Sequence, residues 1–308
     1  MRISQIYYKA AFICLLFLSP TAQANSVACF TSSIGQFCIE LFETQTPITT
    51  ANFLKYIDSD AYTNGIFHRS IPGFVIQGGG FKIADVASGK SLAAVNTFAP
   101  IVNEFRISNT RGTVAMAKIA GNPNSATSQW FVNLADNSGL PPDLDHQNGG
   151  FTVFGRVIFD GMTVFDTIAK LPIRKLDLLG TPSDVPLKDF DGVHAALSNL
   201  VKIDRIEVTD PTGIFSDSIL SFAVDIGTGQ MYHVSLRLIS DTPSYEFQLD
   251  PASVVLLSAT PGNIATLSNS TNQLQIPSVM IGASSAVKNV VMQLTDAELY
   301  KFTLLSFE

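Results

Sequence analysis

Apolar and polar residues alternate over many short stretches of this 308-residue chain, whereas two stretches carry apolar residues at helical spacing. Alternation predicts β-strands, and apolar residues three or four positions apart predict an amphipathic helix. The first helix is expected over residues 48–57, directly after Pro47, because proline suits the first turn of a helix. A second helix is expected over residues 163–170, after Gly161. Strands are expected at residues 27–30, 37–41, 67, 74–77, 113–117, 129–134, 151–158 and 201–208.

Many short strands with only two helices predict a mainly β fold, a closed antiparallel barrel capped by the helices. Residues 171–200 contain three prolines and are expected to be looser than the rest. Residues 210–213, with the sequence DPTG, form a turn-type cluster without periodicity. We therefore expect a barrel domain over residues 25–209, a linker at 210–213 and a separate domain over residues 214–308.

The C-terminal region lacks cysteine and tryptophan, is rich in Ser, Thr, Val and Leu, and alternates apolar with polar residues. This pattern predicts a small all-β, sandwich-like domain. Three of its segments recur 55 or 56 positions later, which indicates a two-copy repeat whose units bury each other's apolar faces. Chance similarity between strand patterns is the alternative. The matching pairs are residues 224–227 with 279–282, 234–238 with 290–294, and 245–249 with 300–304.

Cys29 and Cys38 flank a segment that predicts a β-hairpin. If Ser33 and Ile34 are the two loop residues, Cys29 lies directly opposite Cys38 on the paired strand. Directly opposed residues of antiparallel strands lie within reach of a disulfide. We therefore predict a Cys29–Cys38 bridge, with two free buried thiols or a lipidated Cys29 as alternatives.

The first 24 residues have the pattern of a secretory signal peptide. Arg2 and Lys9 precede an apolar run over residues 10–18, and Ala22-Gln23-Ala24 matches a small-residue cleavage site. The run is about half of the roughly 20 apolar residues that a membrane span needs. We expect export, most simply to a periplasm, with secretion or surface attachment as alternatives and no stable membrane span after signal removal. Cleavage also removes Cys14, which leaves an even number of cysteines for an oxidising compartment.

Charge and histidine placement narrow the possible ligands. The net charge is −7 and only 15% of residues are charged, so we expect no nucleic-acid partner. His68 and His146 have no second ligand at metal-binding spacing, and His233 has no nearby cysteine or carboxylate cluster in the sequence. Glycines 78–80 do not precede a Lys-Ser/Thr pair, so they do not form a phosphate loop. We expect neither a metal nor a cofactor.

The most informative segment is residues 67–79, with the sequence FHRSIPGFVIQGG. It places one permanent cation, Arg69, and one amide, Gln77, beside an apolar strand. Arginine keeps its proton and cannot act as a general base, and the segment has no nucleophile with a paired base. The residues therefore indicate that a neutral peptide is gripped and polarised without proton abstraction.

Three further segments strengthen this interpretation: GTVAMA at residues 112–117, SQWFVN at 128–133 and FTVFGRV at 151–157. Together with residues 67–79, they closely resemble the signature of the cyclophilins, the peptidyl-prolyl cis/trans isomerases, and occur in the order of that family. The resemblance covers about residues 26–208. Within the family, the chain is similar to the bacterial exported members. It implies the cyclophilin barrel and isomerase activity on proline-containing unfolded or flexible polypeptides, without a covalent intermediate.

The resemblance also implies roles for individual residues. Arg69, Gln77 and Phe74 would be catalytic, although strict alternation points Phe74 away from Val75, so that its role requires a local bend. The remaining residues would contact the peptide or form the proline pocket: Val75, Ala117, Lys118, Gln129, Phe131, Leu144 and Phe151. Trp130 alternates with Phe131 and is expected in the barrel core.

The chain departs from many eukaryotic cyclophilins at four site positions. Asp143 stands where they have a tryptophan, so we predict weak cyclosporin binding. Phe151 replaces a histidine, Val75 a methionine and Lys118 an asparagine. Bacterial exported members share much of this divergence, so it does not exclude activity. Isomerase activity is the expected function. A peptide-binding chaperone module with little turnover is the main alternative, and an adhesive role of the C-terminal domain is a third.

Overall fold

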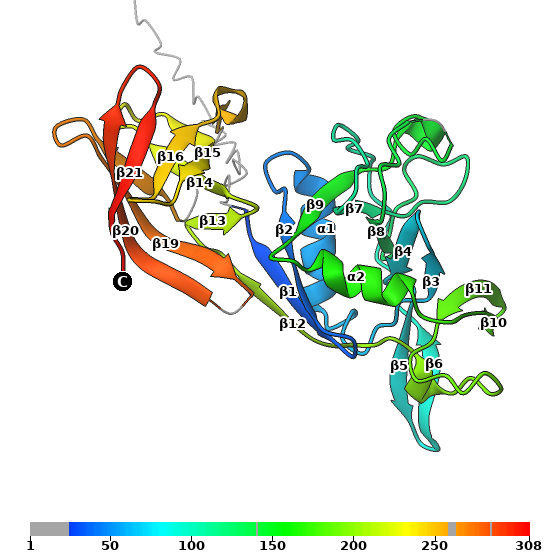
Figure 1. The fold of residues 1–308 in the computed structure, drawn as a ribbon. Helices are drawn as coiled ribbons and strands as arrows, with labels where there is room; N and C mark the ends of the chain where they lie inside the picture. The colour runs from blue at the N-terminus through cyan, green and yellow to red at the C-terminus, as the bar shows by residue number, and fades with distance from the viewer. Residues whose placement is uncertain (1–24, 140, 258–262, 284) are drawn as a thin grey trace, which may run out of the picture.

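The computed structural model describes residues 25–139, 141–257, 263–283 and 285–308, so the expected signal peptide lies outside the described residues. Two β-rich units lie side by side, and β12 leads from the first to the second (Figure 1). The prediction of a mainly β fold with a barrel, two α-helices and an additional C-terminal β region is confirmed. Across the described ranges, no helix is long and apolar enough to span a bilayer.

The first unit is an eight-stranded antiparallel sheet in the order β12-β1-β2-β9-β7-β8-β4-β3. A bridge between Ile66 and Lys202 joins its two ends, so the sheet closes into a barrel. Its strands are β1 (Val27–Ser32), β2 (Gln36–Leu41), β3 (Arg69–Ile71), β4 (Val75–Gly78), β7 (Thr113–Met116), β8 (Trp130–Asn133), β9 (Val153–Ile158) and β12 (Ile203–Thr209).

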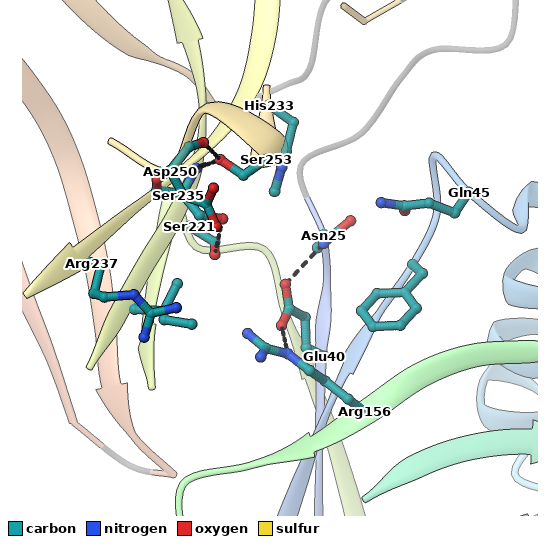
Figure 2. Close-up of a pocket in the computed structure, with 12 residues that line it drawn as sticks. Asn25, Glu40, Gln45, Arg156, Ser221, His233, Ser235, Arg237, Asp250 and Ser253 are labelled. Atoms are coloured by element: carbon teal, nitrogen blue, oxygen red, sulfur yellow. Dashed lines mark hydrogen bonds and ion pairs between the residues drawn. The ribbon is translucent and has the colours of Figure 1, made fainter. Parts of the chain in front are cut away.

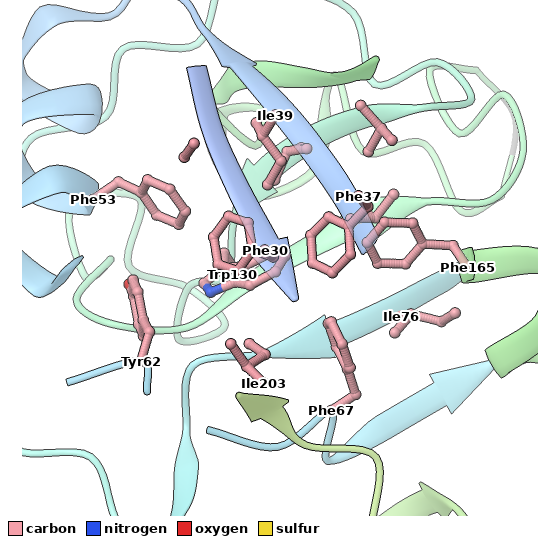
Figure 3. Packing of buried hydrophobic residues seen from close by; sticks show 14 of the residues in the cluster. Phe30, Phe37, Ile39, Phe53, Tyr62, Phe67, Ile76, Trp130, Phe165 and Ile203 are labelled. Atoms are coloured by element: carbon pink, nitrogen blue, oxygen red, sulfur yellow. The ribbon is translucent and has the colours of Figure 1, made fainter. Parts of the chain in front are cut away.

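Both predicted helices are present, as α1 (Pro47–Asp58) and α2 (Met162–Ala169). Pro47 occupies the first turn of α1, where its missing N–H costs no hydrogen bond. Aromatic rings fill the barrel between the helices and the sheet (Figure 3). Trp130 is fully buried among them, as predicted, with Phe53 at 5.8 Å and Phe67 at 5.8 Å between ring centroids.

The predicted cysteine hairpin is confirmed. Cys29 and Cys38 are directly paired between β1 and β2 and form a disulfide. The hairpin turn is closed by Ser32, whose backbone N–H donates to the carbonyl of Gly35 at 3.0 Å. Local pairing alone therefore brings the two sulfur atoms together.

Residues 171–200 are more regular than expected, which corrects the sequence interpretation. They contain a hairpin of β10 (Ile173–Leu178) and β11 (Thr181–Pro186), whose turn places Leu179 and Gly180 at positive φ. A second unanticipated hairpin is formed by β5 (Phe81–Val86) and β6 (Gly89–Ala94). The two hairpins share a small apolar cluster at one end of the barrel. The described residues also include three short 3-10 helices: η1 (Gln147–Gly149), η2 (Leu197–Asn199) and η3 (Pro251–Ser253).

The C-terminal unit is one continuous sheet that closes on itself, instead of two separate sheets of a sandwich. The order β14-β18-β19-β20-β21-β16-β15 returns to β14, because β14 pairs with both β18 and β15. Short strands β13 and β17 pair at its margins. The strands are β13 (Gly213–Ser216), β14 (Ile219–Asp225), β15 (Met231–Ser240), β16 (Glu246–Leu249), β17 (Val255–Leu256), β18 (Ala265–Ser268), β19 (Gln273–Gly282), β20 (Ser285–Asp296) and β21 (Lys301–Ser306).

The three repeated segments lie on successive strands of two antiparallel meanders, β14-β15-β16 and β19-β20-β21. Leu236 pairs with Leu249 in the first meander, and Met292 pairs with Leu304 in the second, at positions that the repeat makes equivalent. Both meanders also have a bulge two residues further on. The two-copy repeat remains a prediction from the sequence, and these shared registers support it.

The two units pack directly against each other. Val27, Cys38 and Ile158 of the first unit share an apolar cluster with Ile214 and Met280 of the second. The backbone N–H of Phe159 also donates to Ser216 Oγ at 3.3 Å.

Candidate functional site

Three polar side chains form a row on the outer face of the first barrel. Arg69 on β3 is paired with Gln77 on β4, and its Nη1 donates to Gln77 Oε1 at 3.4 Å. Gln77 Nε2 in turn donates to Gln129 Oε1 at 2.7 Å. Because the amide of Gln77 is held at both ends, its carbonyl oxygen is turned towards the guanidinium. The row therefore fixes one side of Arg69 and leaves its other N–H groups for a ligand.

An apolar cluster lies next to this row. Phe131 is paired directly with Gln77 across β4 and β8, so its ring lies beside the amide. Phe131, Val75 and Leu144 are each at most 4% exposed. The full cluster contains Val75, Ala115, Phe131, Leu144 and Val153, with Phe42, Phe74, Ile107, Ala117 and Phe151 packed against it.

Strand alternation explains why polar and apolar groups meet here. Successive side chains on β8 point to opposite faces, so Trp130 enters the barrel core while Phe131 faces outward. Val75 and Gln77 lie two residues apart on β4 and face the same side. The barrel core thus supports a rigid outer surface that carries the candidate chemistry.

Phe74 joins the cluster by the local bend that the sequence required. It precedes β4 instead of lying within it, and its N–H donates to the carbonyl of Ile71, the last residue of β3, across the turn. A residue in a turn does not follow strand alternation, so Phe74 and Val75 contact the same apolar cluster. The structure thereby brings Phe74 next to the proposed pocket residues.

Lys118 turns towards the backbone of the loop that precedes β9. Its Nζ donates to the carbonyls of Asn148 at 2.8 Å and Gly150 at 2.6 Å, and lies 4.7 Å from the centroid of the Phe151 ring. Burial lowers the pKa of Lys118 to about 8. Phe151 meets Phe131 edge-to-face at 5.8 Å, so Lys118 supports the apolar wall through Phe151.

A buried asparagine network positions the loops of the site, and the sequence interpretation missed it. Asn137 Nδ2 donates to the Phe74 carbonyl at 3.0 Å and to Asn133 Oδ1 at 2.7 Å. Asn133 donates in turn to Asn109, whose Nδ2 also donates to the Phe151 carbonyl at 3.0 Å. An asparagine at the end of the apolar strand WFVN was the available signal, because a buried amide must be hydrogen-bonded.

His68 lies beneath the polar row and is 3% exposed. Burial lowers the pKa of His68 to about 4, with a hydrogen bond to Gln129 opposing the shift and the Arg69 charge adding to it. The imidazole is therefore neutral at physiological pH. The neutral ring therefore adds no second positive charge beside Arg69.

A separate cavity of about 240 Å³ lies between the two units (Figure 2). In it, Glu40 accepts hydrogen bonds from Arg156 at 2.7 Å and from Asn25 at 2.9 Å, and His233 approaches from the second unit. Sequence analysis did not anticipate a carboxylate near His233, because Glu40 belongs to the other unit. Burial lowers the pKa of His233, the Glu40 charge opposes this shift, and Arg156 adds to it. Within the described ranges, no cluster of three metal-ligating side chains is present.

Comparison with known proteins shows which family the first unit matches. Residues 27–191 match the family described as cyclophilin type peptidyl-prolyl cis-trans isomerase/CLD. A peptidyl-prolyl cis-trans isomerase of Acinetobacter baylyi is 43% identical over 159 residues, which cover 51% of this chain and 79% of that protein. Peptidyl-prolyl cis-trans isomerase B of Escherichia coli K12 is 39% identical over 163 residues, 52% of this chain and 92% of that protein.

A crystal structure of a Cryptosporidium parvum cyclophilin type isomerase, determined in the presence of the dipeptide Ala-Pro, matches with 26% identity. It covers 59% of this chain and 98% of that chain, with a TM-score of 0.43. The matched residues 27–191 contain Arg69, Gln77 and the apolar cluster beside them. The chain belongs to the cyclophilin-type peptidyl-prolyl cis-trans isomerase family.

Proposed function

We propose that this isomerase acts on exported polypeptides and that Arg69 assists rotation of their X-Pro bonds without a covalent intermediate. The observation that carries the proposal is the row Arg69–Gln77–Gln129 beside the apolar residues Val75 and Phe131. A fixed cation next to an apolar wall can hold a proline ring and reach its nitrogen at the same time.

Rotation about an X-Pro bond must overcome about 18–20 kcal/mol, because the nitrogen lone pair is delocalised into the carbonyl. As the bond twists, the lone pair returns to the prolyl nitrogen, which can then accept a hydrogen bond. In the planar cis and trans ground states the prolyl nitrogen is not a hydrogen-bond acceptor. A donor aimed at this nitrogen therefore stabilises the transition state selectively, which is what raises the rate. Arg69 supplies the donor, and it keeps its proton throughout.

The neighbouring residues have supporting roles in this mechanism. Gln129 holds Gln77, and Gln77 holds one edge of the Arg69 guanidinium, so that the donor is oriented before the peptide binds. Phe131, Val75 and Leu144 exclude water from the proline ring. Their apolar surface also lowers the local dielectric, which strengthens the hydrogen bond from the guanidinium.

Two features support export. The Cys29–Cys38 disulfide suits an oxidising compartment, where such bonds persist. The first 24 residues have the charge and hydropathy pattern of a cleavable signal. We place the mature protein in a periplasm, where newly exported chains fold and slow proline isomerisation, over tens to hundreds of seconds, limits their folding.

The test is Arg69→Ala, with Arg205→Ala as a matched loss of an exposed arginine that pairs with Glu207 on β12. We expect kcat/KM on a short proline peptide to fall by about 10²–10³ in Arg69→Ala, as for loss of a key transition-state donor. Peptide binding should survive, and Arg205→Ala should behave as wild type.

Wild-type kinetics in Arg69→Ala would rule out the proposed donor. A wild-type protein that binds the peptide without accelerating its isomerisation would instead favour the peptide-binding chaperone module.

Cyclosporin binding tests the effect of Asp143, which lies next to the pocket residue Leu144. Asp143 occupies the position where many relatives carry an indole donor, and its carboxylate faces His146. We expect micromolar or weaker binding by titration calorimetry. A nanomolar dissociation constant would show that the indole is dispensable here.

A further inference from the structure

Two cavities of about 370 Å³ each open from the interior of the C-terminal barrel. We call them the β20 pocket, lined by Val287, Val290 and Met292, and the β15 pocket, lined by Tyr232, Val234 and Leu236. Their volumes fall at the small end of the range for ligand pockets, about 300–1,000 Å³. Each is therefore large enough for an apolar group, and neither belongs to the Arg69 site on the first barrel.

The two pockets are built from equivalent positions of the repeat. Tyr245 and Phe247 of the first copy line the β20 pocket, and Tyr300 and Phe302 of the second copy line the β15 pocket. Each copy thus contributes aromatic residues to the pocket of the other. The aliphatic lining follows the same rule: Val279, Ile281, Val290, Met292 and Leu304 in the β20 pocket correspond to Val224, Ile226, Val234, Leu236 and Leu249 in the β15 pocket.

Strand pairing places the pockets at opposite ends of the barrel. Phe247 on β16 pairs directly with Phe302 on β21, and the two strands are antiparallel. Because these phenylalanines are equivalent in the repeat, a local two-fold axis passes between them. Tyr245, directly before β16, and Leu249, at the end of β16, lie four residues apart and line different pockets. The pockets are therefore separated by roughly 13 Å along the chain.

The chemistry of the lining specifies an uncharged, apolar occupant. None of the described residues that line the two pockets carries a charge. The polar groups are few: the tyrosine hydroxyls, and Thr228 and Asn269 in the β15 pocket. An ionised ligand would lose its hydration there without gaining a charged partner.

The rims of the pockets point to a partner larger than a small molecule. Tyr245 is 49% exposed, Ile281 44% and Phe307 55% at the β20 pocket, and Tyr300 is 53% exposed at the β15 pocket. A small ligand inside either cavity would leave these side chains in water. A polypeptide that inserts one side chain would also cover the rim, and exposed apolar patches of this kind mark sites of protein interaction.

We propose that the C-terminal barrel is a second polypeptide-binding site, which takes one apolar side chain of an extended chain in each of its two equivalent pockets. The site goes beyond isomerisation, and it rests on the proposed function only for the choice of occupant, an unfolded chain of the kind that the isomerase acts on. The C-terminal unit would hold a client while the first barrel rotates its proline bonds.

The probe is a fluorescein-labelled, proline-free peptide of 12 Ser and Gly residues with one central leucine, and the control probe has serine in place of the leucine. Binding to the full mature chain is measured by titration calorimetry and fluorescence anisotropy. We expect two equivalents of the leucine probe to bind, with affinity at least about tenfold above that of the serine probe, because burial of the leucine side chain removes apolar surface from water.

Matched variants assign the sites. Ile281→Asp and Ile226→Asp place a charge at equivalent positions of the two pockets, and Leu305→Asp places one at an exposed position of β21 outside both linings. Each pocket variant should bind one equivalent, the double variant none, and Leu305→Asp two. Tyr245→Ser and Tyr300→Ser, at half-exposed rim positions, give an independent pair with little risk to folding. Circular dichroism melting checks that each variant is folded.

The outcomes separate this proposal from the isomerase proposal. Arg69→Ala should bind two equivalents of the leucine probe, and the double pocket variant should isomerise a short proline peptide as wild type does. Equal binding of the leucine and serine probes, or two equivalents bound by the folded double variant, would overturn the proposal. So would saturation of both pockets by n-octanol with no binding of the leucine probe, since that result assigns the pockets to small molecules.

Discussion

The interior of the first barrel is filled by aromatic rings, whereas the interior of the C-terminal barrel is lined mainly by aliphatic side chains and opens into a pocket at each end. In the first barrel, Trp130, Phe53 and Phe67 are completely buried, and the candidate chemistry lies on the outer face. In the second barrel, the candidate binding surfaces lie inside. A closed sheet can therefore serve either as a rigid support for an external site or as a container.

The packing of the two interiors gives the largest expected difference. Phe53→Ala removes a fully buried ring that touches Trp130 and Phe154, and it should lower the free energy of unfolding by about 3–5 kcal/mol. Phe302 is also buried, but it lines the β15 pocket of the second barrel. Phe302→Ala should therefore lower the free energy of unfolding by less, because part of the space around this ring is already empty. Urea unfolding, with Trp130 fluorescence for the first barrel and circular dichroism for both, measures each loss.

The chain has a single tryptophan, so its fluorescence reports on the first barrel alone. Equal losses for Phe53→Ala and Phe302→Ala would contradict the contrast between a filled and an open interior.

Acid should affect the first barrel through His68. The pKa of this buried ring is lowered from 6.5 to about 4 in the folded state, so the unfolded chain binds the proton more readily. Its contribution to stability is complete above pH 6.5 and is lost as the pH falls towards 4, by about 2 kcal/mol at pH 5. Urea unfolding of wild type at pH 7.5 and pH 5, followed by Trp130 fluorescence, should show this loss.

His68→Gln should show a smaller difference between the two pH values, and His194→Gln, in an exposed loop, should match wild type. If His68→Gln retained the full pH dependence, another group would have to be responsible.

The disulfide should give an effect of about the same size as that of His68. Cys29 and Cys38 close a short loop with a sequence separation of 9, and a cross-link over such a loop stabilises a protein by about 2–3 kcal/mol. The double variant Cys29→Ser/Cys38→Ser should therefore unfold at lower urea concentration by Trp130 fluorescence. Dithiothreitol should lower the midpoint of wild type and leave that of the double variant unchanged.

A wild-type midpoint in the double variant would show that local strand pairing alone supports this hairpin. The C-terminal barrel has no cysteine, so its binding of the leucine probe should not depend on the redox state.

Local signals account for what could be predicted. The hairpin with its disulfide depends on residues close in sequence, and α1 follows from Pro47 and one apolar face. Other elements lacked such signals. The turn between β10 and β11 uses Leu179 at a φ of 57°, and leucine does not mark a hairpin turn in the way that Asn-Gly does. Prolines in β11 further concealed that strand.

The candidate site was partly predictable for the same reason. Alternation placed Val75 on the same face as Gln77, and Gln129 on the same face as Phe131. It could not show that Gln77, on β4, donates to Gln129, directly before β8. The asparagine network and the approach of Glu40 to His233 join residues that are far apart in sequence. Such contacts depend on which strands become neighbours, and a single sequence does not specify that choice.

The sequence by itself determined the strand-rich pattern and the family motifs, and it predicted the repeat, because these are properties of residue order and local periodicity. Only the tertiary structure decided which face of each barrel carries a candidate binding site. It turned the Arg69 row outward over a filled core. It also paired β16 with β21, so that the β14–β16 and β19–β21 meanders contribute residues to each other's pockets. Barrel closure brings distant strands together, and that closure is a property of the whole folded chain.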